Sequence, residues 1–441
     1  MSSNGKAAFL EQVLQLATAQ GAPADALLRD STVLTLSFES GRLKGSQLTQ
    51  EAGLNLRVVV NGKVGVAGTT DLSNADDVVA RAFASAAEGE PLVLELPPRS
   101  ELPSVRTFDE SVPGYDVAAL AQLGKAVVSG LVRPGWQVGA GVERNVETVW
   151  FGNSAGQRYQ QKGSAISASA EVTRVAGDDV LMAYDTLAET GRPADQELER
   201  IVQGIVTKIE RAQTIVPAPE GRLPVMFTAE GLAAVLLPVR QALSGKSVLQ
   251  GISPLGGKIG EVMFDPSFTM VDDPLMEGRV ASRAADDEGV VSRRLPLIER
   301  GRVCAFVYDL ETAARAATKS TGHGARSTFG KPGISYSNLV IEPGPHDEAA
   351  LLREVGDGLI VDELIGVGQG NVSSGAFSHP VALAYRVEGG RITGRVKDAA
   401  IAGNAFELLK RIKAVGRDAK WCGGTRYIPP MVFDDVNVAG R

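Results

Sequence analysis

The sequence is poor in the side chains that most often bind metals. Its 441 residues include two cysteines and three histidines, and no two histidines lie at the spacing of a metal-binding helix. The two cysteines, Cys304 and Cys422, are too few for a disulfide framework. This scarcity predicts a chain of a reducing compartment, the cytoplasm.

Long apolar runs and basic clusters are also missing. No stretch approaches the roughly 18 apolar residues that a membrane-spanning helix needs. The apolar helical face of residues 6–19 is interrupted by Glu11, Gln12 and Gln15, which a secretory signal does not tolerate. The formal net charge is −7, whereas phosphate binding needs Lys and Arg gathered on one face. The sequence therefore predicts a soluble protein that binds neither membranes nor nucleic acids.

Hydrophobic residues make up 44% of the chain, which is enough for more than one core. The main boundary falls in Val216–Pro224, where prolines at 217, 219 and 224 cannot continue a helix. We predict an N-terminal α+β domain at 1–90, a linker at 91–115, a central helix–meander–helix region at 116–215 and a C-terminal strand-rich domain at 223–441.

The fold class that these patterns predict is α+β. In the N-terminal region, residues 34–38 and 54–60 alternate as half-buried strands do, and Asn61-Gly62 predicts a tight hairpin. Helices are expected at 74–88 and 194–213. This order favours an antiparallel N-terminal sheet with helices. The strands expected in the C-terminal domain are 262–270, 297–308, 338–341, 381–387, 392–396 and 431–438, wrapped as a barrel-like domain around a buried helix.

That buried helix is expected at 228–244. Its apolar residues recur at steps of three and four and are Leu232, Val235, Leu236, Val239 and Leu243. Thr228 is the expected N-cap and Gly245 the expected end. Pro238 removes an amide bond inside the helix, so we expect a bend or break there. The pattern is typical of a packing helix without chemistry of its own.

Each histidine lies among glycine or proline, which favours loops. His323, in Ser320–Arg326, is expected on a surface loop, and His379, before Pro380, at the entry of a strand. The acidic stretch Asp286-Asp287-Glu288 could bind a hard cation or share a proton, but its spacing favours a solvated or capping turn. Residues 366–375 lack the ending of a phosphate loop. Cys422 alone is more typical of a structural thiol.

Several short stretches nevertheless occur in an order that is informative when they are taken together. They are Asp286–Gly289, Leu297–Gly301, Ser320–Arg326, Gly375–Ser378 and Ala400–Asn404. Together they resemble the C-terminal half of the TldD/PmbA family, once called modulators of DNA gyrase and regarded as zinc metalloproteases. In the TldD branch, a His-Glu-x-x-x-His helix and a C-terminal cysteine hold the zinc. The resemblance places Pro238, Val239 and Leu243 at the His, Glu and second His positions, and Cys422 at the cysteine.

This departure resembles the TldE, or PmbA, branch, and it implies that the chain itself holds no metal. The resemblance implies a non-catalytic subunit of a heteromeric peptidase, with zinc in a TldD-like partner. Such a subunit would complete a chamber for unfolded or short peptides and bind them by strand addition. Candidates for the cavity or for peptide binding are His323, Arg326, Phe377 and Cys422. The alternatives are an autonomous peptidase that uses Cys422 and a homodimeric peptide-binding protein.

Overall fold

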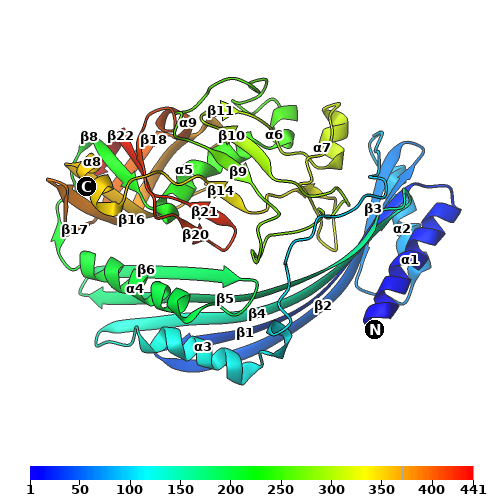
Figure 1. Ribbon diagram of the computed structural model, residues 1–441, viewed down its shortest axis with the longest axis horizontal. Helices are drawn as coiled ribbons and strands as arrows, with labels where there is room; N and C mark the ends of the chain where they lie inside the picture. The colour runs from blue at the N-terminus through cyan, green and yellow to red at the C-terminus, as the bar shows by residue number, and fades with distance from the viewer. Residues whose placement is uncertain (370, 441) are drawn as a thin grey trace.

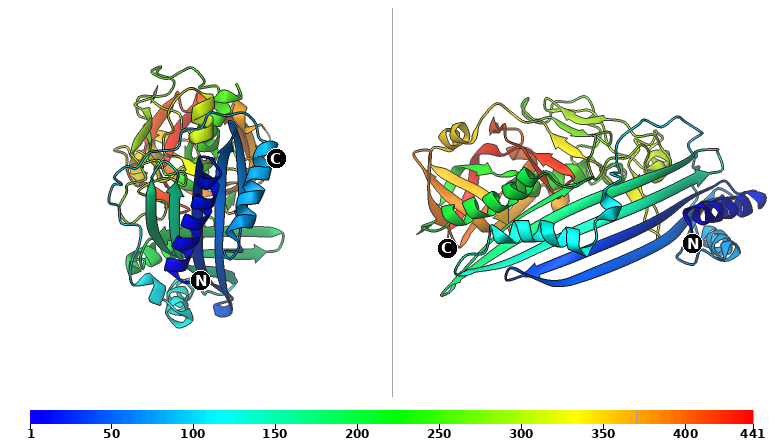
Figure 2. Two further views of the ribbon diagram at one scale, coloured as in Figure 1. Left: turned by 90° about the vertical axis from the view of Figure 1, so that its right-hand side faces the viewer. Right: turned by 60° about the horizontal axis from the view of Figure 1, so that its bottom comes forward.

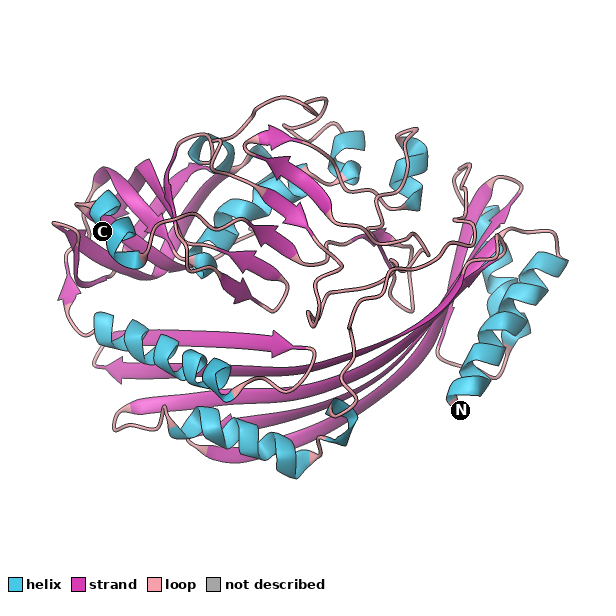
Figure 3. Ribbon diagram, viewed as in Figure 1, coloured by secondary structure: helices cyan, strands magenta, loops and turns pink. Residues whose placement is uncertain are grey.

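The computed structural model describes residues 1–369 and 371–440. A long, curved antiparallel sheet forms one side of the molecule, and the C-terminal domain lies against it (Figure 1). The turned views show the length of this sheet and the helices at its two ends (Figure 2). The structure is therefore the mixed α+β fold that the sequence predicts, and the strands of both halves are seen in Figure 3.

The curved sheet, called here the N-terminal sheet, has the order β3-β2-β1-β4-β5-β6 within the described residues, and all its neighbours are antiparallel. Its strands are β1 (Ala24–Glu39), β2 (Arg42–Val60), β3 (Lys63–Thr69), β4 (Trp136–Asn153), β5 (Arg158–Ala176) and β6 (Asp179–Glu189). β1 pairs with β4 along its length, from Asp25–Asn153 to Glu39–Gly139. The regions 1–90 and 116–215 thus contribute to one sheet.

Helices cover the two ends of this sheet. They are α1 (Ser3–Ala19), α2 (Ala75–Ala87), α3 (Val117–Ser129) and α4 (Asp195–Arg211). α1 and α2 pack with β1–β3 in one core. α3 and α4 pack on a second core that also takes in C-terminal side chains such as Ile360 and Tyr385. Between α2 and α3 the described chain crosses the surface, with isolated β-bridges at Pro91 and Pro98 and the short η1 (Val112–Gly114).

The C-terminal domain contains two larger sheets. The first has the order β11-β10-β9-β14-β21-β20. Its strands are β9 (Met270–Asp272), β10 (Leu295–Glu299), β11 (Arg302–Val303), β14 (Leu339–Ile341), β20 (Lys420–Cys422) and β21 (Arg426–Ile428). A small pair, β12 (Gly324–Ala325) and β13 (Gly333–Ile334), lies apart from it.

The second sheet closes on itself. Its order is β15-β8-β22-β18-β16-β17-β7, with β19 beside β22, and β15 also pairs with β16. This extra pairing closes β15, β8, β22, β18 and β16 into a barrel, as the sequence predicts. The strands are β7 (Ile215–Val216), β8 (Gly221–Phe227), β15 (Gly358–Leu364), β16 (Ala376–Glu388), β17 (Arg391–Val396), β18 (Ala399–Asn404), β19 (Ile412–Val415) and β22 (Met431–Gly440).

Shorter helices complete the C-terminal domain. They are α5 (Ala229–Ala242), α6 (Gly245–Leu249), α7 (Leu310–Arg315), α8 (Glu348–Val355), η2 (Val372–Ser374) and α9 (Ala405–Leu408). None of the described helices has both the length and the apolar character needed to cross a lipid bilayer.

The buried helix α5 confirms most of its prediction. The side chain of Thr228 caps it by accepting a hydrogen bond from the amide of Gly231. The helix runs through Pro238, so it does not break there, and a bend at this residue stays a prediction. Leu236 and Val239 of the same helix are buried against residues distant in sequence, such as Phe268 and Phe406, and this packing offsets the lost amide bond. The predicted end at Gly245 is also wrong, because α5 ends at Ala242 and Gly245 begins α6.

Turn chemistry was predicted better than strand length. Asn61 and Gly62 have φ angles of 50° and 72° and join β2 to β3, which confirms the hairpin. The strand expected at 262–270 is wrong, since regular pairing begins only at Met270. The strand expected at 297–308 is split, because Arg300 and Gly301 form a turn with positive φ between β10 and β11.

Candidate functional site

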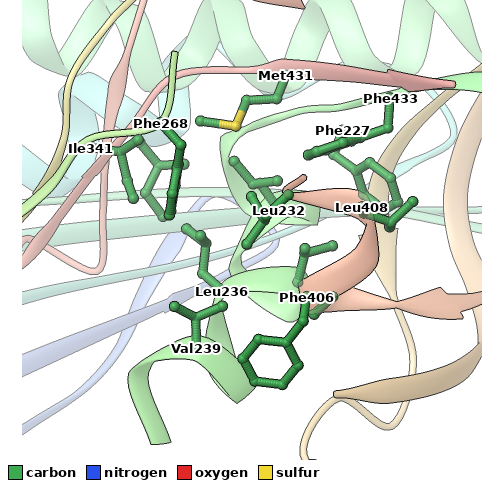
Figure 4. Packing of buried hydrophobic residues seen from close by; sticks show 14 of the residues in the cluster. Phe227, Leu232, Leu236, Val239, Phe268, Ile341, Phe406, Leu408, Met431 and Phe433 are labelled. Carbon is green, nitrogen blue, oxygen red and sulfur yellow. The ribbon is translucent and has the colours of Figure 1, made fainter. Parts of the chain in front are cut away.

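The positions that resemble a metal-binding helix lie in an apolar core. Pro238 is buried, and Val239 and Leu243 have no exposed surface. Val239 lies beside Leu236 and Phe406 in the packed cluster of Figure 4. An ion at this point would lose its water and meet only hydrocarbon, which is very costly. These residues therefore do not fit a zinc ion.

Other side chains do not replace the metal ligands that are absent from α5. The described residues include no group of three His, Cys, Asp or Glu side chains arranged to hold a metal ion. Cys422 ends β20 and is buried, with 7% of its surface exposed. Burial and then the charge of Glu230 raise the pKa of its thiol to about 12. The thiol is thus protonated at neutral pH, a poor ligand and a poor nucleophile.

The histidines are held by partners of their own. His323 is not on a surface loop, as predicted, but is 2% exposed. Its Nε2 atom lies 3.1 Å from Oδ2 of Asp272, a carboxylate that no sequence pattern links to it. His379 lies inside β16 rather than at its entry, with its ring stacked 6.0 Å from Phe377. In the described chain neither histidine hydrogen-bonds to Cys422.

The acidic stretch was predicted to be a solvated or capping turn; it is not solvated, whereas Asp286 does cap backbone amides. Asp286 and Glu288 are fully buried, and Arg57 of the N-terminal sheet reaches Glu288. Arg57 of β2 binds Asp25 and Glu288, and Arg326 places Nη2 2.6 Å from Oδ2 of Asp25. Burial alone would raise the pKa of Asp25, but Arg326 and Arg57 lower it below its usual value. This buried ion cluster joins the N-terminal sheet to the C-terminal domain.

Asp286 is held differently from its neighbours. Its carboxylate accepts hydrogen bonds from the amides of Glu288, Val290 and Gly324 at 2.7–3.0 Å. Burial, and then the charge of Glu288, raise its pKa to about 7. Through these hydrogen bonds the carboxylate of Asp286 orders the backbone of two loops, the one around Glu288 and Val290 and the one at Gly324. This role explains why Asp286 is buried and not in water.

A cavity of about 310 Å³ opens beside this cluster, between the N-terminal sheet and the C-terminal loops. At its wall Arg29 bridges Glu147, at 2.9 Å, and Asp287, at 3.1 Å. The cavity is called here the inter-sheet cavity. Its lining residues are Arg29, Glu147, Val149, Tyr159, Gln161, Val280–Arg283, Ala285, Asp287, Ala325, Arg326 and Ser335. Of the predicted site residues, only Arg326 lines it.

A second hollow, of about 380 Å³, lies beside the edge strand β6. Among the described strands β6 pairs only with β5, so its other edge is open. Val180 and Met182 are more than half exposed, and both line the hollow with Tyr184 and Ile365. An open edge with apolar side chains is the kind of surface to which an extended peptide adds as a further strand. Strand alternation was the sequence signal that could have found it.

Charged residues connect β6 to α5, the helix that carries Pro238 and Val239. Lys420 of β20 lies 2.8 Å from Asp185 of β6 and also binds Glu230 of α5. Next to them, Lys208 of α4 lies 2.8 Å from Asp362 of β15. Burial would lower the pKa of Lys208, but Asp362 and Glu230 raise it above its usual value. These pairs hold the N-terminal sheet and α5 in a fixed relation.

Known proteins resemble the chain over both of its halves. Residues 220–440 match the PmbA/TldA metallopeptidase C-terminal domain, and residues 24–86 match PmbA/TldA metallopeptidase domain 1. A metalloprotease of Methanocaldococcus jannaschii is 32% identical over 213 residues, which span 47% of each chain. A metalloprotease of Methanothermobacter thermautotrophicus is 26% identical over 92% of each chain.

Solved structures agree on the fold. TldE from Thermococcus kodakarensis has a TM-score of 0.89 at 24% identity and covers 98% of this chain and 100% of its own. A protein of Thermotoga maritima titled a putative modulator of a DNA gyrase has a TM-score of 0.89 at 23% identity and covers 98% of this chain and 99% of its own. The C-terminal domain of the PmbA/TldA metallopeptidases matches residues 220–440, which are half of this chain. The chain therefore belongs to the PmbA/TldD metallopeptidase family.

Proposed function

We propose that this chain is the subunit without a catalytic metal in a two-component peptidase of its family. A TldD-like partner would carry the zinc, and this chain would complete the chamber and bind the peptide. The observation that carries the proposal is the apolar burial of Pro238, Val239 and Leu243 at the positions where that partner needs metal ligands. The likeness of the fold to TldE from Thermococcus kodakarensis is consistent with it.

Peptide binding is the part that this chain would supply. The open edge of β6 offers backbone groups, and Val180 and Met182 offer apolar contacts beside it. Backbone pairing gives affinity with little dependence on sequence, which suits a peptidase for unfolded chains. The buried ion cluster would keep the N-terminal sheet at a fixed distance from the C-terminal domain while the peptide binds.

The test compares the chain alone, a TldD-like partner alone and the two together. We expect the isolated chain to bind an unfolded fluorescent peptide without cutting it and to hold far less than one zinc per chain. The mixture should cut the peptide and co-elute as one complex. Stoichiometric zinc with sustained cleavage by the isolated chain would contradict the proposal.

Two alternatives are separated by the same material. A peptidase that uses Cys422 would lose activity in Cys422→Ser, although the raised thiol pKa argues against such a nucleophile. A homodimeric peptide-binding protein would form a dimer by itself and would not exchange subunits with a TldD-like chain. Sedimentation of the mixture at two ratios distinguishes these outcomes.

A further inference from the structure

The hollow beside β6 is acidic as well as apolar. It is called here the β6 hollow, and its volume is about 380 Å³. Glu363 of β15 and Glu171 of β5 belong to its lining, and neither makes an ion pair with a described residue. Asp398, just after β17, lines it as well. The hollow therefore presents carboxylates beside the exposed apolar side chains of Val180 and Met182.

The cations of the same lining are already paired. They are Arg395 and Lys397, and both bind Asp179 at the start of β6. Lys397 places Nζ 3.0 Å from Oδ1 of Asp179, and Arg395 binds the same oxygen. When Asp179 is counted with the lining, four carboxylates stand against two cations. The described lining thus keeps an excess of negative charge after its own ion pairs have formed.

Glu363 is the carboxylate of this lining with the least compensation. Its side chain is half-buried, and in the described chain its carboxylate accepts no hydrogen bond and stays open to solvent. Burial raises its pKa; the charge of Lys208 acts to lower it, but the charges of Asp362 and Glu230 raise it further. Lys208 itself binds Asp362 at 2.8 Å. A cation that entered the hollow would therefore meet an accessible carboxylate that lacks a cation of its own.

The strand register places the apolar side chains where a peptide can reach them. Tyr184 of β6 lies opposite Glu171 of β5, so the two side chains share one face of the sheet. Val180 and Met182 share that face too, because side chains alternate along a strand. Ile365, which follows β15, lines the hollow from the other side. An extended peptide paired with the open edge of β6 would place every second side chain on this face.

A hollow with exposed apolar side chains and surplus carboxylates is complementary to a segment that carries both apolar and basic side chains. We propose that the β6 hollow selects peptides in which a lysine or arginine stands two positions from a large apolar residue, with Glu363 as the group that binds the cation. This proposal rests on the peptide-binding role proposed above and names the class of peptide. Acidic segments would meet like charge and bind more weakly.

The size of the hollow favours a peptide over a subunit surface. Its volume of about 380 Å³ lies in the range of roughly 300–1,000 Å³ that is typical of sites for small ligands. A stable contact between subunits instead buries roughly 800 Å² on each partner, mostly over flat surfaces. A few side chains of one extended segment are therefore the occupant that fits.

The test is a binding titration of the full chain with N-terminally labelled heptapeptide amides, followed by fluorescence anisotropy. The peptides share one neutral sequence with a single leucine, and the residue two positions after it is lysine, glutamine or glutamate. We expect the lysine peptide to bind wild type roughly 5- to 30-fold more tightly than the glutamine peptide, and the glutamate peptide to bind most weakly. A fourth peptide, with lysine directly after the leucine, should lose most of this advantage because its lysine points to the other face.

Glu363→Gln should lower the affinity for the lysine peptide to that for the glutamine peptide. Glu363→Lys should reverse the order, so that the glutamate peptide binds best. Glu88→Gln is the matched control, because it changes the net charge by the same amount and lies at the end of α2, which packs beside β3 at the opposite edge of the N-terminal sheet. It should keep the preference for lysine. Thermal melts confirm folding, and Glu171→Gln, which should reduce the preference, serves if the Glu363 variants do not fold.

The proposal is wrong if the lysine and glutamine peptides bind wild type equally. It is also wrong if Glu88→Gln removes the preference as fully as Glu363→Gln does, since net charge alone would then explain it. A Glu363→Gln chain that keeps the preference but no longer forms a complex with a TldD-like partner would make the hollow a subunit contact and overturn the proposal. If no peptide binds at all, the peptide-binding role fails; if all bind alike, that role stands and only the selection of basic peptides fails.

Discussion

Replacing Arg57 by methionine is expected to destabilise the protein strongly. Arg57 is 2% exposed and binds Asp25 and Glu288, both fully buried. Without it, Asp25 keeps Arg326 at 2.6 Å, and Glu288 keeps the amide of Leu310 at 2.6 Å. Glu288 thus loses its main cation, and Asp25 loses one of its two cations. Breaking a buried ion pair on one side costs about 3–5 kcal/mol.

Lys44→Met is the matched control. Lys44 and Glu39 lie 2.8 Å apart, but both side chains are 64% exposed. A surface pair of this kind contributes little to stability, because water screens it. The two substitutions each remove one cation from an ion pair, so their difference measures the effect of burial.

Urea unfolding, followed by tryptophan fluorescence and by circular dichroism, measures both variants. Trp136 and Trp150 report on the N-terminal sheet, and Trp421 on the C-terminal domain. The double variant Arg57→Met/Glu288→Gln should lose less free energy of unfolding than the two single variants lose together, since no charge is left without its partner. If Arg57→Met costs no more free energy of unfolding than Lys44→Met, the cluster does not hold the sheet to the domain.

Three further results are expected. Leu236→Ala should lower the free energy of unfolding by about 2–5 kcal/mol, because it opens a cavity in the fully packed core of α5; a loss below about 1 kcal/mol in urea unfolding would contradict that packing. Cys422 should react with iodoacetamide far more slowly than Cys304 at pH 7.5, since the pKa of Cys422 is raised to about 12 and its side chain is buried; peptide mapping decides, and equal labelling would refute it. The pKa of Asp286 is about 7 in the folded chain and 3.8 in the unfolded chain, so the folded chain binds this proton more tightly. The contribution of Asp286 to stability is therefore fully present below pH 3.8 and is lost as the pH rises through 7. The urea midpoint of wild type should fall between pH 5 and pH 8 relative to that of Asp286→Ala, and a constant difference would count against this.

Local patterns in the sequence were sufficient for the elements that depend on neighbours in the chain. The hairpin at Asn61-Gly62 needs only residues that accept positive φ, and α5 needs only a cap and an apolar stripe. Both were predicted correctly. The break at Pro238 was not, because the packing that holds the helix together comes from residues distant in sequence, such as Phe268 and Phe406.

The site was harder to predict because its partners are far apart in the chain. Glu288 is buried by Arg57, which lies 231 positions away, and His323 by Asp272 in another sheet. An acidic turn and a glycine-rich histidine both look solvated when read alone. The resemblance alone predicts which positions would correspond to metal ligands, whereas the contacts of Lys420 with Asp185 and Glu230 appear only when β20, β6 and α5 are brought together.

The long pairing of β1 with β4 has a consequence for how the chain can be divided. A fragment that stops in the linker after residue 90 would keep β1, β2 and β3 but lose β4, leaving one whole side of β1 without hydrogen-bonding partners. Such a bare edge invites other chains to pair with it. We therefore expect that fragment to aggregate during expression, whereas a fragment that ends near residue 215 keeps the complete N-terminal sheet together with α3 and α4.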